Sequence, residues 1–166
     1  MSLDETLAFM AKMTPSTPQD WQLSLAFDEV RLTFGERWAG GWIRRARRVS
    51  CFVGAVAPHA ADVSRVAAAF AAVGAVGATV ACRYSEGDLT RMQERLHEIL
   101  LSPLAHDKVL MVGQDPELNK LVVTLTVDDP ELIEKLLNAI PRDAICVSVQ
   151  PGVRIRPLGG SVAPAE

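Results

Sequence analysis

The feature that most constrains the fold is a pattern that occurs twice. Residues 49–70, VSCFVGAVAPHAADVSRVAAAF, and residues 121–140, LVVTLTVDDPELIEKLLNAI, each begin with an apolar run, pass through a short polar break and a proline, and end in an amphipathic segment. The two prolines, Pro58 and Pro130, lie about 70 positions apart, whereas the repeats of solenoids are about 20–50 residues long. The pattern therefore predicts two copies of one small unit, with each proline at the start of a helix.

Each copy is predicted to contain a helix, two strands, a second helix and a third strand. The first copy has a helix over 18–34, strands at 38–43 and 49–56, a helix that Pro58 opens and Gly74 and Gly77 end, and a strand at 77–84. The second has a helix after Ser85, strands at 109–114 and 120–127, a helix after Asp129, and a strand at 143–150.

A crossover from strand to helix to strand is right-handed and returns to the same sheet. We therefore expect an α+β fold of two similar, plait-like α-β-β-α-β copies. Each would be a small, mostly antiparallel sheet with helices on one face. The corresponding domains are residues 18–84 and 85–157, between an N-terminal extension of residues 1–17 and a flexible tail of residues 158–166.

Short polar signals mark where the elements of the second copy end. Ser85, followed three residues later by Asp88, predicts a capping box. Asp129 directly precedes Pro130, at a position where its carboxylate can cap the helix. The segment DPELN at 115–119 lies between two strand-like runs, which predicts a hairpin loop.

The first copy contains an arginine cluster and two tryptophans close together. RRARR at 44–48 predicts a tight, solvated turn, with contact to an anionic partner or a membrane surface as the alternative. Trp38 and Trp42 lie four residues apart on one strand, so we expect them to share a face of the sheet and to lie in the core.

The composition excludes several classes of function. The chain has 166 residues and a net charge of −3, so no overall basic field attracts nucleic acid, and we expect no nucleic-acid partner. No apolar run approaches the ~20 residues that a membrane-spanning helix needs. The N-terminus lacks the features of a signal peptide. We therefore expect either a cytoplasmic protein or an extracytoplasmic piece of a longer precursor.

No residue pattern predicts catalysis. The chain contains no nucleophile elbow, no P-loop, no dinucleotide-binding glycine motif and no zinc-binding HExxH motif. His59, His97 and His106 do not lie at ligand spacing, and capping explains the pair Asp128–Asp129 without chemistry. We expect no enzyme, no catalytic residue, no metal site and no cofactor. A pocket lined by His59 or His106 with a perturbed pKa would argue for an enzyme.

The chain contains three cysteines, an odd number, and no CxxC pair. Cys51, Cys82 and Cys146 all lie in predicted strands, which is typical of buried free thiols. A disulfide between Cys51 and Cys82 is the alternative.

Three segments together form a recognisable pattern: FGERWAGGWI (34–43), YSEGDLTRMQERLHEI (84–99) and VGQDPELNKLVVTLTVDDPELIEKLL (112–137). They resemble the pro-regions of bacterial serine proteases of the α-lytic protease and streptogrisin type. In the third segment, Asp115, Asn119, Val122 and Val123 occupy matching positions of the D-x-x-x-N-x-V-V-V-x-V hairpin motif. The resemblance covers about residues 20–157. Two features depart from the pattern: RRARR stands where a short acidic or glycine turn is expected, and no protease domain is present.

The resemblance implies a non-catalytic domain that binds a protein through a sheet edge and a C-terminal tail. Two segments are candidates for that edge, namely 120–127 and VRIRP at 153–157, which Pro151 and Pro157 bracket. The predicted partner-binding residues are Val153, Arg154, Ile155 and Arg156. We expect a binding or regulatory domain. The alternatives are a genuine protease pro-region that acts as chaperone and inhibitor, and an intracellular ferredoxin-like sensor or dimerisation module.

Overall fold

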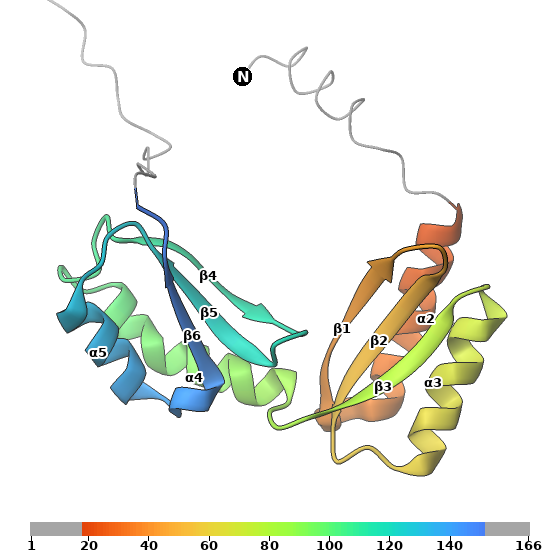
Figure 1. Ribbon diagram of the computed structural model, residues 1–166. Coiled ribbons are helices and arrows are strands. Elements are labelled where there is room, and N and C mark those ends of the chain that lie inside the picture. Colours follow the sequence, from red (N-terminus) through yellow and green to blue (C-terminus); the bar gives the residue numbers. More distant parts are fainter. Residues whose placement is uncertain (1–17, 152–166) are drawn as a thin grey trace, which may run out of the picture. The chain divides into compact units, whose positions relative to one another are not determined.

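The computed structural model describes residues 18–151, which form two compact units; along the chain, the first ends at Ala81 and the second begins at Cys82. Each unit contains two α-helices and one three-stranded sheet (Figure 1). The chain is therefore an α+β protein, as the sequence predicts. None of the helices in the described part is long and apolar enough to cross a membrane.

Unit 1 has the element order helix, two strands, helix and strand. It comprises α2 (Pro18–Phe34), the 3₁₀ turn η1 (Gly35–Arg37), β1 (Trp38–Arg45), β2 (Val49–Val56), α3 (Ala60–Ala72) and β3 (Val76–Cys82). The sheet order is β1-β2-β3, and β1 is antiparallel to β2. Both helices lie on one face of the sheet, where the alternate residues Cys51, Val53 and Ala55 of β2 are fully buried (Figure 1).

Unit 2 repeats this element order. It comprises α4 (Glu86–Leu100), β4 (Val109–Asp115), β5 (Lys120–Leu125), α5 (Pro130–Ala139), the 3₁₀ turn η2 (Arg142–Ala144) and β6 (Ile145–Val149). The sheet order is β4-β5-β6. Leu121, Val123 and Leu125 of β5 are fully buried against apolar residues of α4 and α5.

The sheets are mixed rather than mostly antiparallel. β4 pairs with β5 antiparallel through a short hairpin, whereas β6 pairs with β5 in parallel. The difference arises because a helix lies between β5 and β6, and such a crossover returns the chain in its original direction.

The start of α3 and the start of β3 differ from the sequence prediction. Pro58 does not open α3, because His59 adopts an extended conformation and the helix begins at Ala60. Gly74, with a φ of 74°, follows the end of α3, whereas Gly77 lies inside β3. A Cβ atom at Gly77 would lie 2.6 Å from the carbonyl oxygen of Val66, so the strand can approach α3 only through a glycine.

The expectation that Trp38 and Trp42 share one face is wrong. β1 pairs Trp38 with Ala55 but Trp42 with Phe52, and the register shifts between Trp38 and Gly40. Such a bulge inserts an extra residue and so reverses the alternation of faces. Trp38 is consequently buried against the helices, whereas Trp42 is half-buried on the opposite face and stacks on Phe52 at 5.4 Å between ring centroids.

Candidate partner-binding edge and its surroundings

The prediction that segment 120–127 lies at a sheet edge is wrong. β5, which covers most of the segment 120–127, is the central strand of its sheet, with β4 on one side and β6 on the other. Its backbone groups are therefore already paired and cannot accept a partner strand. The strand order is set by non-local pairing, which the residues of β5 alone do not reveal.

β6 is an edge strand within the part of the chain that the structure describes. The N–H of Gln150 donates to the carbonyl oxygen of Leu125 at 2.7 Å. Because backbone groups alternate in direction along a strand, the N–H groups of Val147 and Val149 point away from β5. These two groups form the start of an edge that another strand can pair with.

The second predicted edge follows directly from β6. Val153, Arg154, Ile155 and Arg156 lie outside the described residues, which end in the turn at Pro151. β6 and Pro151 therefore come shortly before the predicted partner-binding residues in the chain.

An ion pair ties the start of β1 to the start of α3. Arg37, which directly precedes β1, donates to Asp62 at 2.7 and 3.3 Å. Asp62 is buried and also accepts from the backbone N–H of His59 at 2.9 Å, so it caps α3. The hydrogen bonds from the Arg37 side chain and from the His59 backbone lower the pKa of Asp62 from 3.8 to about 2.

We expect Asp62 to make the stability of unit 1 sensitive to acid. A group whose pKa is lower in the folded state stabilises the fold above its unfolded pKa, and that contribution disappears as the pH falls. For Asp62 the loss should fall between about pH 4 and pH 2. Urea unfolding followed by tryptophan fluorescence at several pH values should show this loss, and Asp62→Asn should remove it. An unchanged pH dependence in the Asp62→Asn variant would contradict the assignment.

A similar ion pair occurs in unit 2. Lys108, which directly precedes β4, donates to Asp129 at 2.5 Å. Asp129 is the N-cap of α5 and accepts from the N–H of Leu132 at 3.1 Å. The Lys108 ammonium group and then the Leu132 N–H lower the pKa of Asp129. The predicted caps at Asp129 and Ser85 are confirmed, since Ser85 exchanges hydrogen bonds with Asp88 at 3.0 and 3.1 Å.

The β4–β5 hairpin holds the segment that connects the two units. Asn119 adopts a φ of 53°, and its side-chain oxygen accepts from the N–H groups of Arg83 and Tyr84 at 3.0 and 2.9 Å. Its amide group donates to the Tyr84 carbonyl at 2.8 Å. Asp115 closes the predicted loop by accepting from the N–H groups of two loop residues. Both polar residues of the hairpin motif therefore have structural roles.

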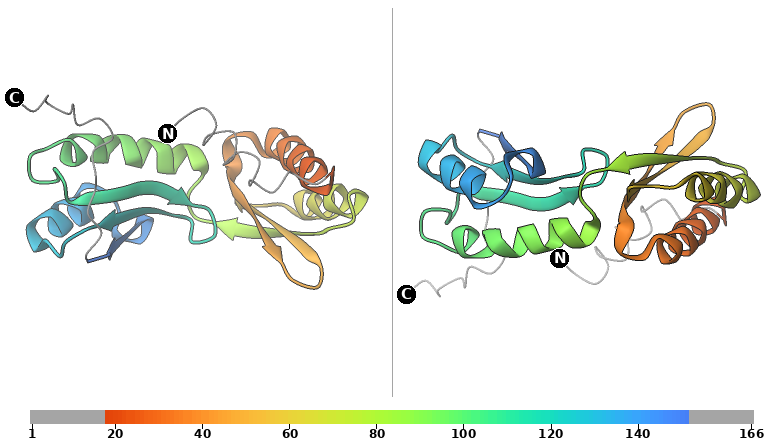
Figure 2. Two further views of the ribbon diagram at one scale, coloured as in Figure 1. Left: turned by 90° about the horizontal axis from the view of Figure 1, so that it is seen from above. Right: turned by 90° about the horizontal axis from the view of Figure 1, so that it is seen from below.

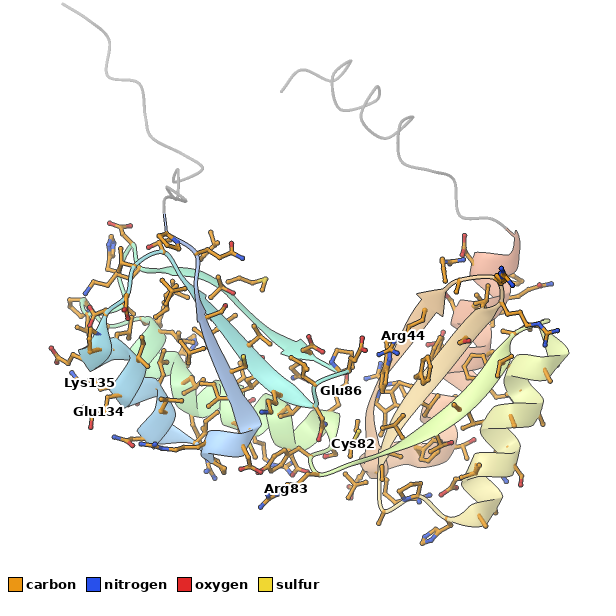
Figure 3. The ribbon with its side chains drawn as sticks, in the orientation of Figure 1. Arg44, Cys82, Arg83, Glu86, Glu134 and Lys135 are labelled. Atoms are coloured by element: carbon orange, nitrogen blue, oxygen red, sulfur yellow. The ribbon has the colours of Figure 1, made fainter. Side chains whose placement is uncertain are left out.

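Asp143 contacts the same connecting segment from η2. Its carboxylate pairs with Arg83 at 2.5 Å and accepts from the Tyr84 hydroxyl at 3.0 Å. Figure 3 shows Arg83 at the point where the chain leaves β3 after Cys82. Burial and the hydrogen bond to Asp143 raise the pKa of Tyr84. Sequence reasoning missed this cluster because its members are distant along the chain.

The titratable groups of the described residues do not assemble into a metal site. No three His, Cys, Asp or Glu side chains between residues 18 and 151 lie close enough to bind an ion together. A hollow along the outer face of α4 is lined by Thr90, Gln93, Glu94 and His97. Neither His59 nor His106, the two histidines that would have argued for an enzyme, lines it.

The three cysteines are free thiols, so the alternative disulfide between Cys51 and Cys82 does not form. Cys51 is fully buried, and burial raises the pKa of its thiol. A raised pKa keeps the thiol protonated and so makes it a poor nucleophile.

No family model matches the chain, and no curated protein is significantly similar to it.

Proposed function

We propose that this chain is a non-catalytic binding domain, similar to the pro-regions of secreted bacterial serine proteases, that binds a protein by extending one of its sheets. The observation that carries the proposal is that β6 is an edge strand whose N–H groups at Val147 and Val149 point away from β5. Residues 153–156 follow shortly after this strand in the sequence. In this mode of recognition, main-chain hydrogen bonds provide affinity and side chains provide specificity.

We also propose that the two units are copies of one ancestral unit. The first supporting observation is a shared irregularity. The register shifts between the first and third residues of β1, at Trp38 and Gly40, and at the same place in β4, at Val109 and Met111. Bulges are specific features that tend to be retained within families.

The second supporting observation is a similar ion pair. In each unit, the residue directly before the first strand is a cation, Arg37 or Lys108, and it binds an aspartate at the start of the second helix. The two aspartates differ in position, because Asp129 is the N-cap of α5 whereas Asp62 lies three residues after the N-cap of α3. The shared bulge therefore supports common descent more strongly than the ion pair does.

Inhibition of a protease tests the binding function. The chain should slow peptide hydrolysis by a serine protease of the α-lytic or streptogrisin type. Arg154→Pro removes a backbone N–H and should weaken inhibition about fivefold or more, because one hydrogen bond contributes ~1 kcal/mol. Arg154→Ala retains that N–H and is the matched control, which should inhibit like the parent chain.

Three other outcomes would change the proposal. Equal inhibition by Arg154→Pro and the parent chain would exclude an edge at this residue. Inhibition together with a protease encoded next to the chain would favour a genuine pro-region. No inhibition, together with dimers in sedimentation, would favour the ferredoxin-like sensor or dimerisation module instead.

A further inference from the structure

The β1–β2 hairpin ends in a dense group of positive charges. Four of the five residues from 44 to 48 are arginines. Arg44 and Arg45 are the last residues of β1, and the three residues that follow form the bend to β2. Both views in Figure 2 show this hairpin extending beyond the two helices of its unit. The sequence prediction of a turn over 44–48 is therefore too long by two residues, and the longer strand carries the arginines outward.

The fold supports the base of this tip and leaves its end exposed. The Arg44 guanidinium lies 5.3 Å from the centre of the Phe52 ring, and Arg45 pairs with Asp20 of α2. Arg47 and Arg48 are exposed, and neither forms an ion pair with a residue that the structure describes. The two outermost cations are consequently available to an external anion.

The size of the tip distinguishes among anionic partners. Five residues of extended chain span only about 16 Å. A protein that binds single-stranded nucleic acid needs a basic groove that follows the backbone, together with aromatic platforms for the bases. The tip is a point rather than a groove, so it offers no track for the backbone of a nucleic acid. A lipid surface offers many phosphates in one plane and requires no groove.

We propose that the tip of the β1–β2 hairpin binds the surface of membranes rich in anionic phospholipids. The stacked rings of Trp42 and Phe52 lie behind the arginines on the hairpin, and the indole N–H of Trp42 is buried, so these rings support the tip rather than contact lipid. Clustered cations are attracted to the surface of anionic membranes. The hairpin would thus place the cations of Arg47 and Arg48 at the lipid phosphates.

Sedimentation with vesicles tests this binding. The full chain should sediment with vesicles that contain phosphatidylglycerol and should remain in solution with pure phosphatidylcholine vesicles. A cation near an anionic surface contributes about fivefold to affinity, so Arg47→Gln combined with Arg48→Gln should weaken binding about 25-fold. Arg47→Lys combined with Arg48→Lys retains the charge and should bind like the parent chain. Binding should also decline as salt is added, because the interaction is screened.

The matched control removes two positive charges at positions outside the hairpin tip. Arg65→Gln combined with Arg95→Gln replaces two exposed arginines on α3 and α4 and should leave vesicle binding unchanged. Circular dichroism should show that all variants are folded. The proposal is wrong if the control variant loses as much binding as the tip variant, or if phosphatidylglycerol confers no preference. It is also wrong if the tip binds a single-stranded oligonucleotide but not vesicles.

Discussion

Replacing Phe70 with alanine should remove most of the stability of unit 1. Phe70 is fully buried in α3 and contacts Phe27 of α2 edge-to-face, with ring centroids 4.7 Å apart. Removing a buried phenylalanine side chain costs about 3–5 kcal/mol, because transfer energy is lost and a cavity remains. Small domains have only ~0.1 kcal/mol of stability per residue, so a unit of this size cannot easily absorb that loss.

The chain provides a selective probe for this experiment. All three tryptophans, Trp21, Trp38 and Trp42, lie in unit 1, so their fluorescence during urea unfolding reports on that unit. The control is Val63→Ala on the same helix, because Val63 is 48% exposed and its truncation should change stability by less than about 0.5 kcal/mol. Equal unfolding midpoints for the two variants would show that Phe70 does not organise this core.

Replacing Asn119 should destabilise unit 2 through two separable effects. The side chain makes three hydrogen bonds with the backbone of Arg83 and Tyr84, and each contributes ~1 kcal/mol. The backbone φ of 53° adds about 1–2 kcal/mol of strain for a residue such as alanine. Asn119→Ala should therefore lower the free energy of unfolding by about 4–5 kcal/mol.

Two further substitutions separate these contributions. Asn119→Gly accepts the positive φ and loses only the hydrogen bonds, so it should be the milder change. Asn119→Asp retains the acceptor for the two N–H groups but loses the donor to the Tyr84 carbonyl. Urea unfolding followed by far-UV circular dichroism gives the free energy of unfolding of each variant. Hydrogen exchange at the amides of Arg83 and Tyr84 shows whether these two N–H groups are still hydrogen-bonded. If exchange at these amides is unchanged in Asn119→Gly, the connecting segment does not depend on Asn119.

The elements that sequence reasoning predicted well are those with local signals. Pro18 and Gly35 delimit α2, Ser85 caps α4, and the alternation of apolar residues indicates β5. Each of these signals acts within about four residues, so the sequence displays it directly.

The errors concern features that arise from contacts between distant residues. The bulge after Trp38 depends on how β1 pairs with β2, and it inverted the predicted face of Trp42. The central position of β5 depends on β6, which follows after a helix. The ion pairs of Arg37 with Asp62 and of Lys108 with Asp129 form only once a strand and a helix have been brought together.

The connection between the units has a consequence for cleavage of the chain. Only Arg83, Tyr84 and Ser85 separate β3 from α4, and the backbone N–H groups of all three are hydrogen-bonded to Asn119 or Asp88. A protease must bind several residues of extended chain in its active site. This segment can adopt that conformation only if its hydrogen bonds to Asn119 and Asp88 break. Trypsin should therefore leave the peptide bond after Arg83 intact in the native protein, and among the described residues it should cut first at the exposed arginines of the β1–β2 turn.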